Sequence, residues 1–325
     1  SILQDCKRTN VPPNKTTPST QAFQKTMTMS TPTTTTTTTA SKAATEIRVV
    51  PNKKLYVSEP EPYWFGNDEN PKDDPSWTNN NWLKSRFHFS FAEYHNYSNQ
   101  DFGSLRVMND DLVQPHRGFG THPHANMEIV TYVVNGKLTH QDTMGTNESL
   151  GRGSIQFMTA GSGIRHSEFN HGDEPLRFIQ TWINPVRSGL TPNYGSYCGD
   201  DGKEDRHNKI QHLVSSATNK KNGQEAPVQV QQDVNGYASE LELGQTVVHD
   251  LPANSQAYLL CIEGDVTVNG KELHRHDACE IVGDQSKPSK LEIKATGTEP
   301  TENGDLAHFL MFTMPHVPGS GRRDL

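Results

Sequence analysis

Two pairs of side chains within residues 118–170 have the types and the spacing of a metal site. The first pair is His122 and His124, and the second pair is His166 and Glu168. In an extended segment residues i and i+2 project from the same face, so each pair can supply two ligands from one strand. Neutral imidazoles and a carboxylate are ligands that a borderline divalent transition metal accepts. The spacing therefore predicts one metal centre built from two strands.

The sequence between the two pairs predicts the strands that bring them together. Residues 129–134 are β-branched or aromatic, and the dipeptide Asn135-Gly136 that follows them is a strong signal for a hairpin turn. Residues 155–158 are another strand candidate, and residues 161–163 predict a tight turn just ahead of the second pair. We therefore expect an antiparallel barrel in which a meander places the two ligand strands side by side.

These motifs resemble the two cupin motifs, in the form carried by the pirin family. The first motif corresponds to residues 120–124 with Glu128 and Gly136, and the second corresponds to residues 163–166 with Asn170. By resemblance, Glu128 occupies a motif position that pirins do not use for the metal.

Within this family the sequence is more similar to the bacterial pirin-like quercetin dioxygenases than to animal pirin. The stretches that carry this similarity are 122–132, 159–168 and Thr191-Pro192, and the resemblance extends over residues 82–315. By resemblance, the four metal ligands are His122, His124, His166 and Glu168.

The resemblance implies a metal-dependent dioxygenase that opens the central ring of a flavonol such as quercetin with O2 and releases carbon monoxide. Iron is the metal that the family favours, but the donors alone do not select it, since nickel, cobalt, copper, manganese and zinc accept the same side chains. The 3-hydroxyl group of the flavonol would bind the metal and lose its proton to Glu168, the one catalytic residue that we assign. The expected partners are therefore a small phenolic or enolic substrate and O2.

The alternative is a protein without catalysis. Animal pirin resembles this chain in fold and ligand set, and it is regarded as an iron-dependent transcriptional co-regulator whose metal oxidation state alters a surface that meets a protein partner. The sequence has no Lys/Arg cluster of the kind used for nuclear import, which favours the enzyme. A metal protein that acts on another small enol or phenol is a third hypothesis.

The second half of the chain resembles a copy of the first half that has lost its ligands. Residues 258–264 parallel residues 132–136, and residues 266–270 contain another hairpin signal. Aligning the glycines that end the first two stretches places Asp250 and Pro252 where the first half has its histidine pair. The second half is therefore expected to lack a metal centre.

We expect an all-β protein of two tandem cupin domains, which are barrels of the double-stranded β-helix or jelly-roll type. The N-terminal, metal-binding domain is expected at residues 46–200, with an insertion at residues 59–81. The C-terminal domain, without metal ligands, is expected at residues 201–325. Residues 189–205 are rich in Gly, Asp and Tyr, which is typical of a linker.

One segment imitates a cupin motif. His274, His276 and Glu280 have the His-x-His-x-x-x-Glu spacing of the first motif. They follow a hairpin signal, however, where the motif should precede one, and no later His-x-Glu completes a ligand set. We interpret residues 274–276 as a solvated turn.

The first 45 residues differ in composition from the rest of the chain. They contain an unbroken threonine run at residues 33–39 and several prolines, and they are poor in acidic residues. Such a segment cannot bury enough apolar surface to offset its chain entropy, so we expect a disordered tail at residues 1–45. The same composition also fits a transit peptide, which would direct the protein to an organelle.

Charge and cysteine content set the remaining expectations. The net charge of −8, from 30 basic and 38 acidic residues, gives no basic field to attract nucleic acid or a membrane surface, and no apolar run is long enough to cross a bilayer. The four cysteines are scattered and form no Cys-x-x-Cys pair. We therefore expect reduced thiols and an intracellular protein, located in the cytoplasm, or in the nucleus under the alternative function.

Overall fold

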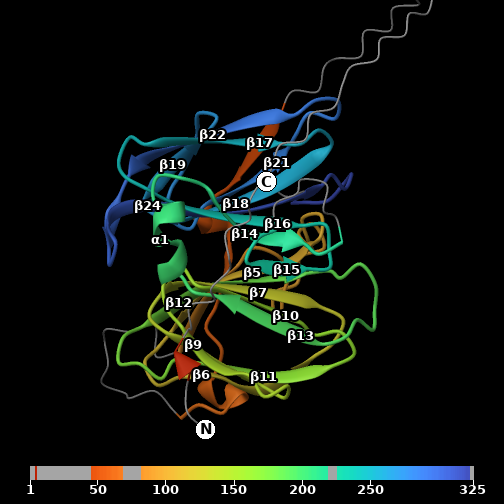
Figure 1. The fold of residues 1–325 in the computed structure, drawn as a ribbon, viewed down its shortest axis with the longest axis vertical. Helices are drawn as coiled ribbons and strands as arrows, with labels where there is room; N and C mark the ends of the chain where they lie inside the picture. The colour runs from red at the N-terminus through yellow and green to blue at the C-terminus, as the bar shows by residue number, and fades with distance from the viewer. Residues whose placement is uncertain (1–3, 6–44, 69–81, 219–224, 323–325) are drawn as a thin grey trace, which may run out of the picture.

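The computed structural model describes residues 4–5, 45–68, 82–218 and 225–322. They form four β-sheets, which pair into two sandwiches stacked one on the other (Figure 1). Helical structure in these residues is limited to four short segments: η1 (Asn52–Lys54), η2 (Pro62–Phe65), η3 (Asp200–Gly202) and α1 (Lys203–Arg206). No helix in this part of the chain is long and apolar enough to cross a membrane.

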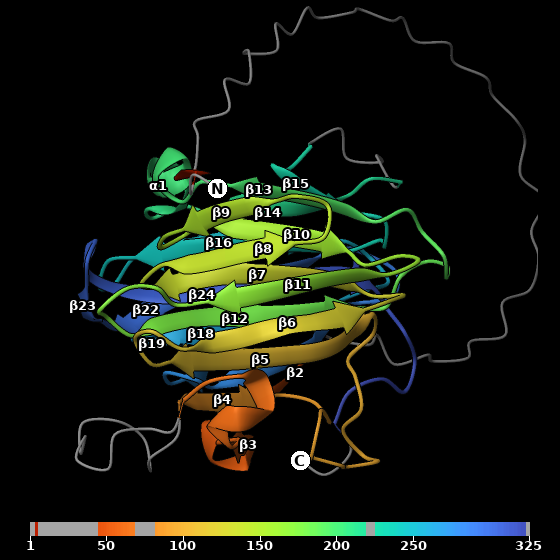
Figure 2. The ribbon, with the colours of Figure 1, turned by 90° about the horizontal axis from the view of Figure 1, so that it is seen from below.

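The N-terminal sandwich consists of an outer and an inner sheet. In spatial order, the N-outer sheet contains β1 (Gln4–Asp5), β9 (Asn147–Leu150), β8 (Leu138–Asp142), β11 (Ile164–Phe169) and β6 (Gly118–His124). Figure 2 is viewed from the side of this sheet, on which β9, β8, β11 and β6 follow one another. The N-inner sheet contains β13 (Asn193–Tyr197), β10 (Ile155–Thr159), β7 (Glu128–Asn135), β12 (Leu176–Ile183), β5 (Leu105–Val113), β4 (Leu83–Phe87) and β3 (Tyr56–Ser58).

The C-terminal sandwich repeats this plan. The C-inner sheet contains β15 (Val228–Val230), β14 (Gln211–Ser216), β16 (Asn235–Leu241), β24 (Gly304–Pro315), β18 (Ser255–Glu263), β21 (Ala278–Val282) and β2 (Glu46–Val50), and β23 (Glu299–Thr301) pairs with β24. The C-outer sheet contains β17 (Thr246–Leu251), β22 (Ser289–Gly297), β19 (Asp265–Val268) and β20 (Lys271–Leu273).

The largest apolar core lies between the two inner sheets. It joins Tyr132 and Val134 of β7 to Tyr258 and Leu260 of β18. A second core fills the interior of the C-terminal sandwich, where aliphatic side chains and Phe309 pack together. The two sandwiches therefore share a buried interface.

Polar side chains separate two small apolar clusters inside the N-terminal sandwich. By strand alternation, Ile129, Thr131 and Val133 of β7 face this interior. Ile129 belongs to a cluster with Met158, and Val133 belongs to a cluster with Trp82. Thr131, which lies between the two clusters, marks a polar layer inside the barrel.

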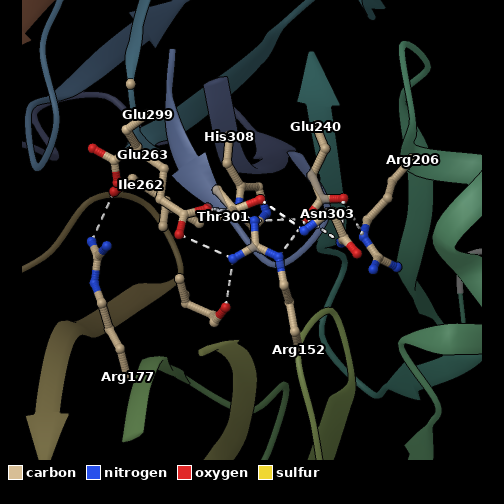
Figure 3. A network of polar contacts seen from close by, with 12 residues as sticks. Arg152, Arg177, Arg206, Glu240, Ile262, Glu263, Glu299, Thr301, Asn303 and His308 are labelled. Atoms are coloured by element: carbon tan, nitrogen blue, oxygen red, sulfur yellow. Dashed lines mark hydrogen bonds and ion pairs between the residues drawn. The ribbon is translucent and has the colours of Figure 1, made fainter. Parts of the chain in front are cut away.

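Buried ion pairs cross the interface between the sandwiches (Figure 3). Arg152, in the turn before β10, lies 2.6 Å from a carboxylate oxygen of Glu263 and 2.8 Å from one of Glu240. His308 of β24 also contacts Glu263, at 2.9 Å, and its other ring nitrogen lies 2.9 Å from the hydroxyl of Tyr132. Charged groups as well as apolar packing therefore hold the inner sheets together.

The Asn135-Gly136 turn differs from our expectation of a hairpin. The strands on its two sides, β7 and β8, lie in different sheets, so the turn is a corner between the N-inner and N-outer sheets. The backbone of Gly136 has φ 76°, and an added Cβ would lie 2.7 Å from a backbone carbonyl oxygen. Turn residues specify a change of chain direction but not the sheet that the next strand joins. The Asn269-Gly270 turn is a true hairpin, because β19 and β20 pair across it.

Strand β2 belongs to the C-terminal sandwich, whereas we expected the N-terminal domain to begin at residue 46. Strand β2 pairs with β21, with Val49 opposite Cys279. Residues 46–50 form a strand, and only long-range pairing decides which sheet this strand completes. The expected linker at 189–205 likewise contains β13, which pairs with β10.

The structure describes only parts of the remaining segments. The predicted tail lies outside the described residues, apart from residue 45 and the two residues of β1, which pair with β9. The expected insertion at 59–81 is described as far as residue 68. Within it, Phe65 packs against Trp82 and Phe119, each at 5.3 Å between ring centroids, and so anchors the segment beside the start of β6.

The expectation of four reduced cysteines is wrong for Cys198, which is disulfide-bonded. Cys261 and Cys279 are free and buried, as small apolar residues of the C-terminal core. Disulfide formation requires two sulfur atoms to be brought close by the fold, which cysteine spacing alone does not reveal.

Candidate metal centre

Three imidazoles converge where β6 and β11 pair. These strands are antiparallel neighbours, and His122 lies directly opposite His166. The Nε2 atoms of the two rings are 3.1 Å apart. The ring of His124 has its centroid 4.8 Å from that of His122 and 4.9 Å from that of His166. One donor atom from each of the three side chains lies within 4.8 Å of the others.

The geometry of the two Nε2 atoms fits a shared metal ion. Two nitrogens about 2.0–2.1 Å from one ion, at tetrahedral or right angles, lie about 2.9–3.4 Å apart. The Nδ1 atom of His122 lies 2.7 Å from the carbonyl oxygen of Gly120, so Nδ1–H donates there and the Nε2 lone pair points towards His166. This hydrogen bond fixes the tautomer that a metal needs.

Burial keeps the other two imidazoles neutral. Burial, and then the neighbouring histidines, lower the pKa of His166 to about 2. Burial and His122 lower the pKa of His124 to about 4. Neutral imidazole is the form that binds a metal, so at neutral pH these side chains are ready to do so.

Glu168 is almost fully buried, at 2% exposure, as is His166. A bulge in the pairing of β11 with β6 falls between His166 and Glu168. One carboxylate oxygen accepts hydrogen bonds from Gln156 (2.9 Å) and Thr131 (3.2 Å), and the other accepts one from Gln180 (2.5 Å). All three donors are neutral side chains of the N-inner sheet. The carboxylate therefore has no cationic partner among these donors.

The sequence prediction missed His140, which joins the site from β8. His140 pairs directly with Glu168 of β11, and its side chain is fully buried. Donor atoms of His140, His166 and Glu168 form a second group in which all lie within 4.8 Å of one another. The alternation of residues 138–142 was the available signal, because it places His140 on the same face as the buried Leu138.

Glu128 points away from the three imidazoles, as strand alternation explains. Glu128 and Tyr132 are four residues apart on β7, so their side chains share the face that is turned to the other sandwich. Its carboxylate accepts hydrogen bonds from the backbone N–H groups of Gln231 (2.6 Å) and Gln232 (2.9 Å) and from the hydroxyl of Thr159 (3.2 Å). Glu128 therefore joins the inner sheet to a loop of the C-terminal sandwich.

Cavities border the imidazoles on the open side of the barrel. His124 and Arg165 line an open cavity of about 510 Å³. Trp182 contacts His124, with 4.9 Å between ring centroids, and lines a second cavity of about 330 Å³ together with Phe91 and Arg106. A small aromatic molecule therefore has room to reach the exposed edge of the three imidazoles.

The segment that imitates a cupin motif is a turn between β20 and β21. His274 is exposed, whereas His276 lies 2.6 Å from a carboxylate oxygen of Asp110 across the interface, so the description as solvated is wrong for His276. The carboxylate of Glu280 pairs with Arg48 of β2. Apolar side chains fill the interior of this sandwich, where the first sandwich has its imidazoles.

Two sandwiches of one plan, with a histidine-rich centre in the first, define a bicupin protein. The sequence matches the Pirin family over residues 71–183 and the family described as the quercetinase C-terminal cupin domain over residues 213–302. A pirin-like protein of Caulobacter vibrioides is 38% identical over 214 residues, which cover 66% of this chain and 90% of that protein. The chain therefore belongs to the pirin family.

Other relatives carry enzyme names. A quercetin 2,3-dioxygenase of Escherichia coli is 37% identical over 211 residues, which cover 64% of this chain and 86% of that protein. The crystal structure of YhhW from Escherichia coli is similar with a TM-score of 0.65 at 31% identity, and covers 84% of this chain and 99% of that one. A structure of the same bacterial pirin in complex with nickel(II) gives the same TM-score.

Proposed function

We propose that the chain is a metal-dependent dioxygenase that opens the central ring of a flavonol such as quercetin with O2. The observation that carries the proposal is the convergence of three imidazoles, one of which, His124, lines an open cavity of about 510 Å³. A structural metal site closes its coordination with protein ligands, whereas a reacting site keeps room for a substrate. The relatives named quercetin 2,3-dioxygenase support the choice of substrate.

Residues His122, His124 and His166 would hold the metal, with Glu168 as the nearby carboxylate. We propose iron, and nickel is the first competitor because a bacterial pirin of similar fold has been crystallised with nickel(II). The bound ion would supply Lewis acidity, which makes the 3-hydroxyl group of a flavonol easier to deprotonate.

Glu168 is the base that we propose for this proton. A carboxylate has room for about four hydrogen-bond donors, and Glu168 accepts three, so one lone pair remains for a substrate hydroxyl. Gln156 and Gln180 each donate to a different oxygen and so fix the plane of the carboxylate. A base held in one orientation loses little entropy when it meets its substrate.

Aromatic side chains would orient the substrate and exclude water. The indole N–H of Trp182 donates to the Oε1 atom of Gln180 (3.0 Å), which sets the direction of the Gln180 amide towards Glu168. The ring of Trp182 also packs edge-on against Phe91, at 5.2 Å between ring centroids. This wall gives a planar flavonol an apolar surface beside the metal centre.

The test is the loss of flavonol absorbance by metal-loaded protein, under air and under nitrogen gas. We expect turnover that requires O2. Glu168→Gln should keep most of the metal, because the three imidazoles remain, and should lose turnover by about 10²- to 10⁴-fold. Glu174→Gln, at an exposed carboxyl group, is the matched control. Turnover by Glu168→Gln at the parent rate would contradict the role assigned to Glu168. A parent protein that binds metal but turns over no flavonol would favour the alternative, a non-catalytic co-regulator that responds to the oxidation state of its metal.

A further inference from the structure

His140 has the support that a metal ligand needs but stands outside the ligand set expected by resemblance. Its Nε2 atom lies 3.1 Å from a carboxylate oxygen of Asp142, and both side chains are fully buried. The Nε2–H group therefore donates to Asp142, and Nδ1 carries the lone pair. In metalloproteins, a ligand histidine commonly gives its second N–H to a carboxylate in this way.

The position of His140 is fixed from two further sides. Its ring stacks on the ring of Tyr194, with 4.5 Å between centroids and 24° between planes. The other carboxylate oxygen of Asp142 accepts the backbone N–H groups of Met144 (2.8 Å) and Thr146 (3.1 Å), which hold Asp142 in place. The direction of the Nδ1 lone pair is thus set by the fold.

Two buried imidazole nitrogens have no hydrogen-bond partner in the described residues. They are Nδ1 of His140 and Nδ1 of His166. A buried polar atom left unpaired costs about 1–3 kcal/mol, and nearly all such atoms in native proteins find a partner. Both belong to residues whose donor atoms lie within 4.8 Å of one another and of a Glu168 carboxylate oxygen.

We propose that His140, His166 and Glu168 form a second, inner position for a divalent transition metal, next to the outer position formed by the three imidazoles of the proposed centre. Two neutral imidazoles and a carboxylate suit the same borderline ions as the outer set. The inference rests on the proposed function in that both positions share His166 and the inner one also uses Glu168, the proposed base.

The shared histidine makes the two positions alternative. A neutral imidazole offers one lone pair, and binding two ions at once would require the loss of its N–H proton. We therefore expect one ion per chain, held at either the outer or the inner position. The inner donors are no more than 2% exposed. An ion held there would occupy the carboxylate of Glu168, the proposed base, which could then not take a proton from the substrate. A protein with its ion at the inner position would hold the metal but would not turn over a flavonol.

The test removes the outer donors and keeps the inner ones. In the His122→Ala/His124→Ala double variant, the metal-free protein should still bind about one Co²⁺ per chain in equilibrium dialysis, more weakly than the parent. Adding His140→Ala should weaken Co²⁺ binding by at least about tenfold. Adding His116→Ala instead, at an exposed histidine, should leave binding unchanged.

Two results would overturn the inner position. One is a double variant that melts like the parent but binds no Co²⁺, and the other is equal binding with and without His140. If the double variant does not fold, His140→Ala in the otherwise unchanged chain replaces it. That single variant should change the Co²⁺ absorption spectrum or the dissociation constant, and no change in either would refute the proposal. Failure of the parent to turn over a flavonol would instead contradict the proposed function and leave these binding results standing.

Discussion

Replacing Arg152 with methionine should destabilise the protein strongly. The guanidinium group is 2% exposed and pairs with two buried carboxylates, Glu240 and Glu263, of the other sandwich (Figure 3). Breaking a buried ion pair by removing one partner costs about 3–5 kcal/mol, because the remaining charge stays buried. Each carboxylate keeps another contact, Arg206 at 3.3 Å for Glu240 and His308 at 2.9 Å for Glu263. We therefore expect the lower end of this range, about 3 kcal/mol.

Urea unfolding, followed by circular dichroism, measures this loss. With a slope of about 3 kcal/mol per molar urea, the unfolding midpoint should fall by about 1 M. Arg275→Met is the matched control, because this arginine pairs with Glu299 at the surface, with side-chain exposures of 48% and 24%. Exposed pairs contribute about 0–1 kcal/mol, so its midpoint should hardly move. Equal shifts for the two variants would refute the view that buried charges hold the sandwiches together.

Three further predictions concern stability. Burial raises the pKa of Glu263, but hydrogen bonds from His308 and Arg152 outweigh burial and lower this pKa below its usual range. The stabilisation by Glu263 is therefore complete above about pH 5 and is lost as the pH falls through and below the unfolded pKa of about 4.3. An acid titration of the unfolding free energy should be flatter for Glu263→Gln than for the parent. Glu128→Leu should lower the free energy of unfolding in urea by about 1–3 kcal/mol, since the two backbone N–H groups that donate to Glu128 lose their partner. A change below about 0.5 kcal/mol would contradict this role. Gly136→Ala should lower the melting temperature, because the residue has φ 76° and a carbonyl oxygen 2.7 Å from the added Cβ; an unchanged melting temperature would contradict the predicted strain.

Local patterns in the sequence predicted several strands of the first sandwich and the three imidazoles that converge between β6 and β11. The two histidines of β6 are two residues apart, so their common face follows from strand geometry alone. Residues 258–263, which parallel residues 132–136 in the sequence, lie in β18. For the second half, comparison of each position with its counterpart in the first half predicts that the ligands are lost.

Pairing between distant strands could not be predicted in this way. The sequence of residues 46–50 does not reveal that β2 pairs with β21 of the second sandwich. The Asn135-Gly136 turn likewise does not distinguish a hairpin from a corner between sheets. His140 was missed for a related reason, since only the pairing of β8 with β11 places it opposite Glu168. These features depend on which elements meet in space.

The metal content of purified protein, compared between the parent and His166→Ala, tests the central claim most directly. His166 belongs to both groups of donors, so its loss leaves no complete set among the described residues. We predict about one transition-metal ion per chain in the parent by elemental analysis, and almost none in the folded variant. A parent that holds no metal even after reconstitution, or a variant that holds as much as the parent, would contradict the existence of the centre.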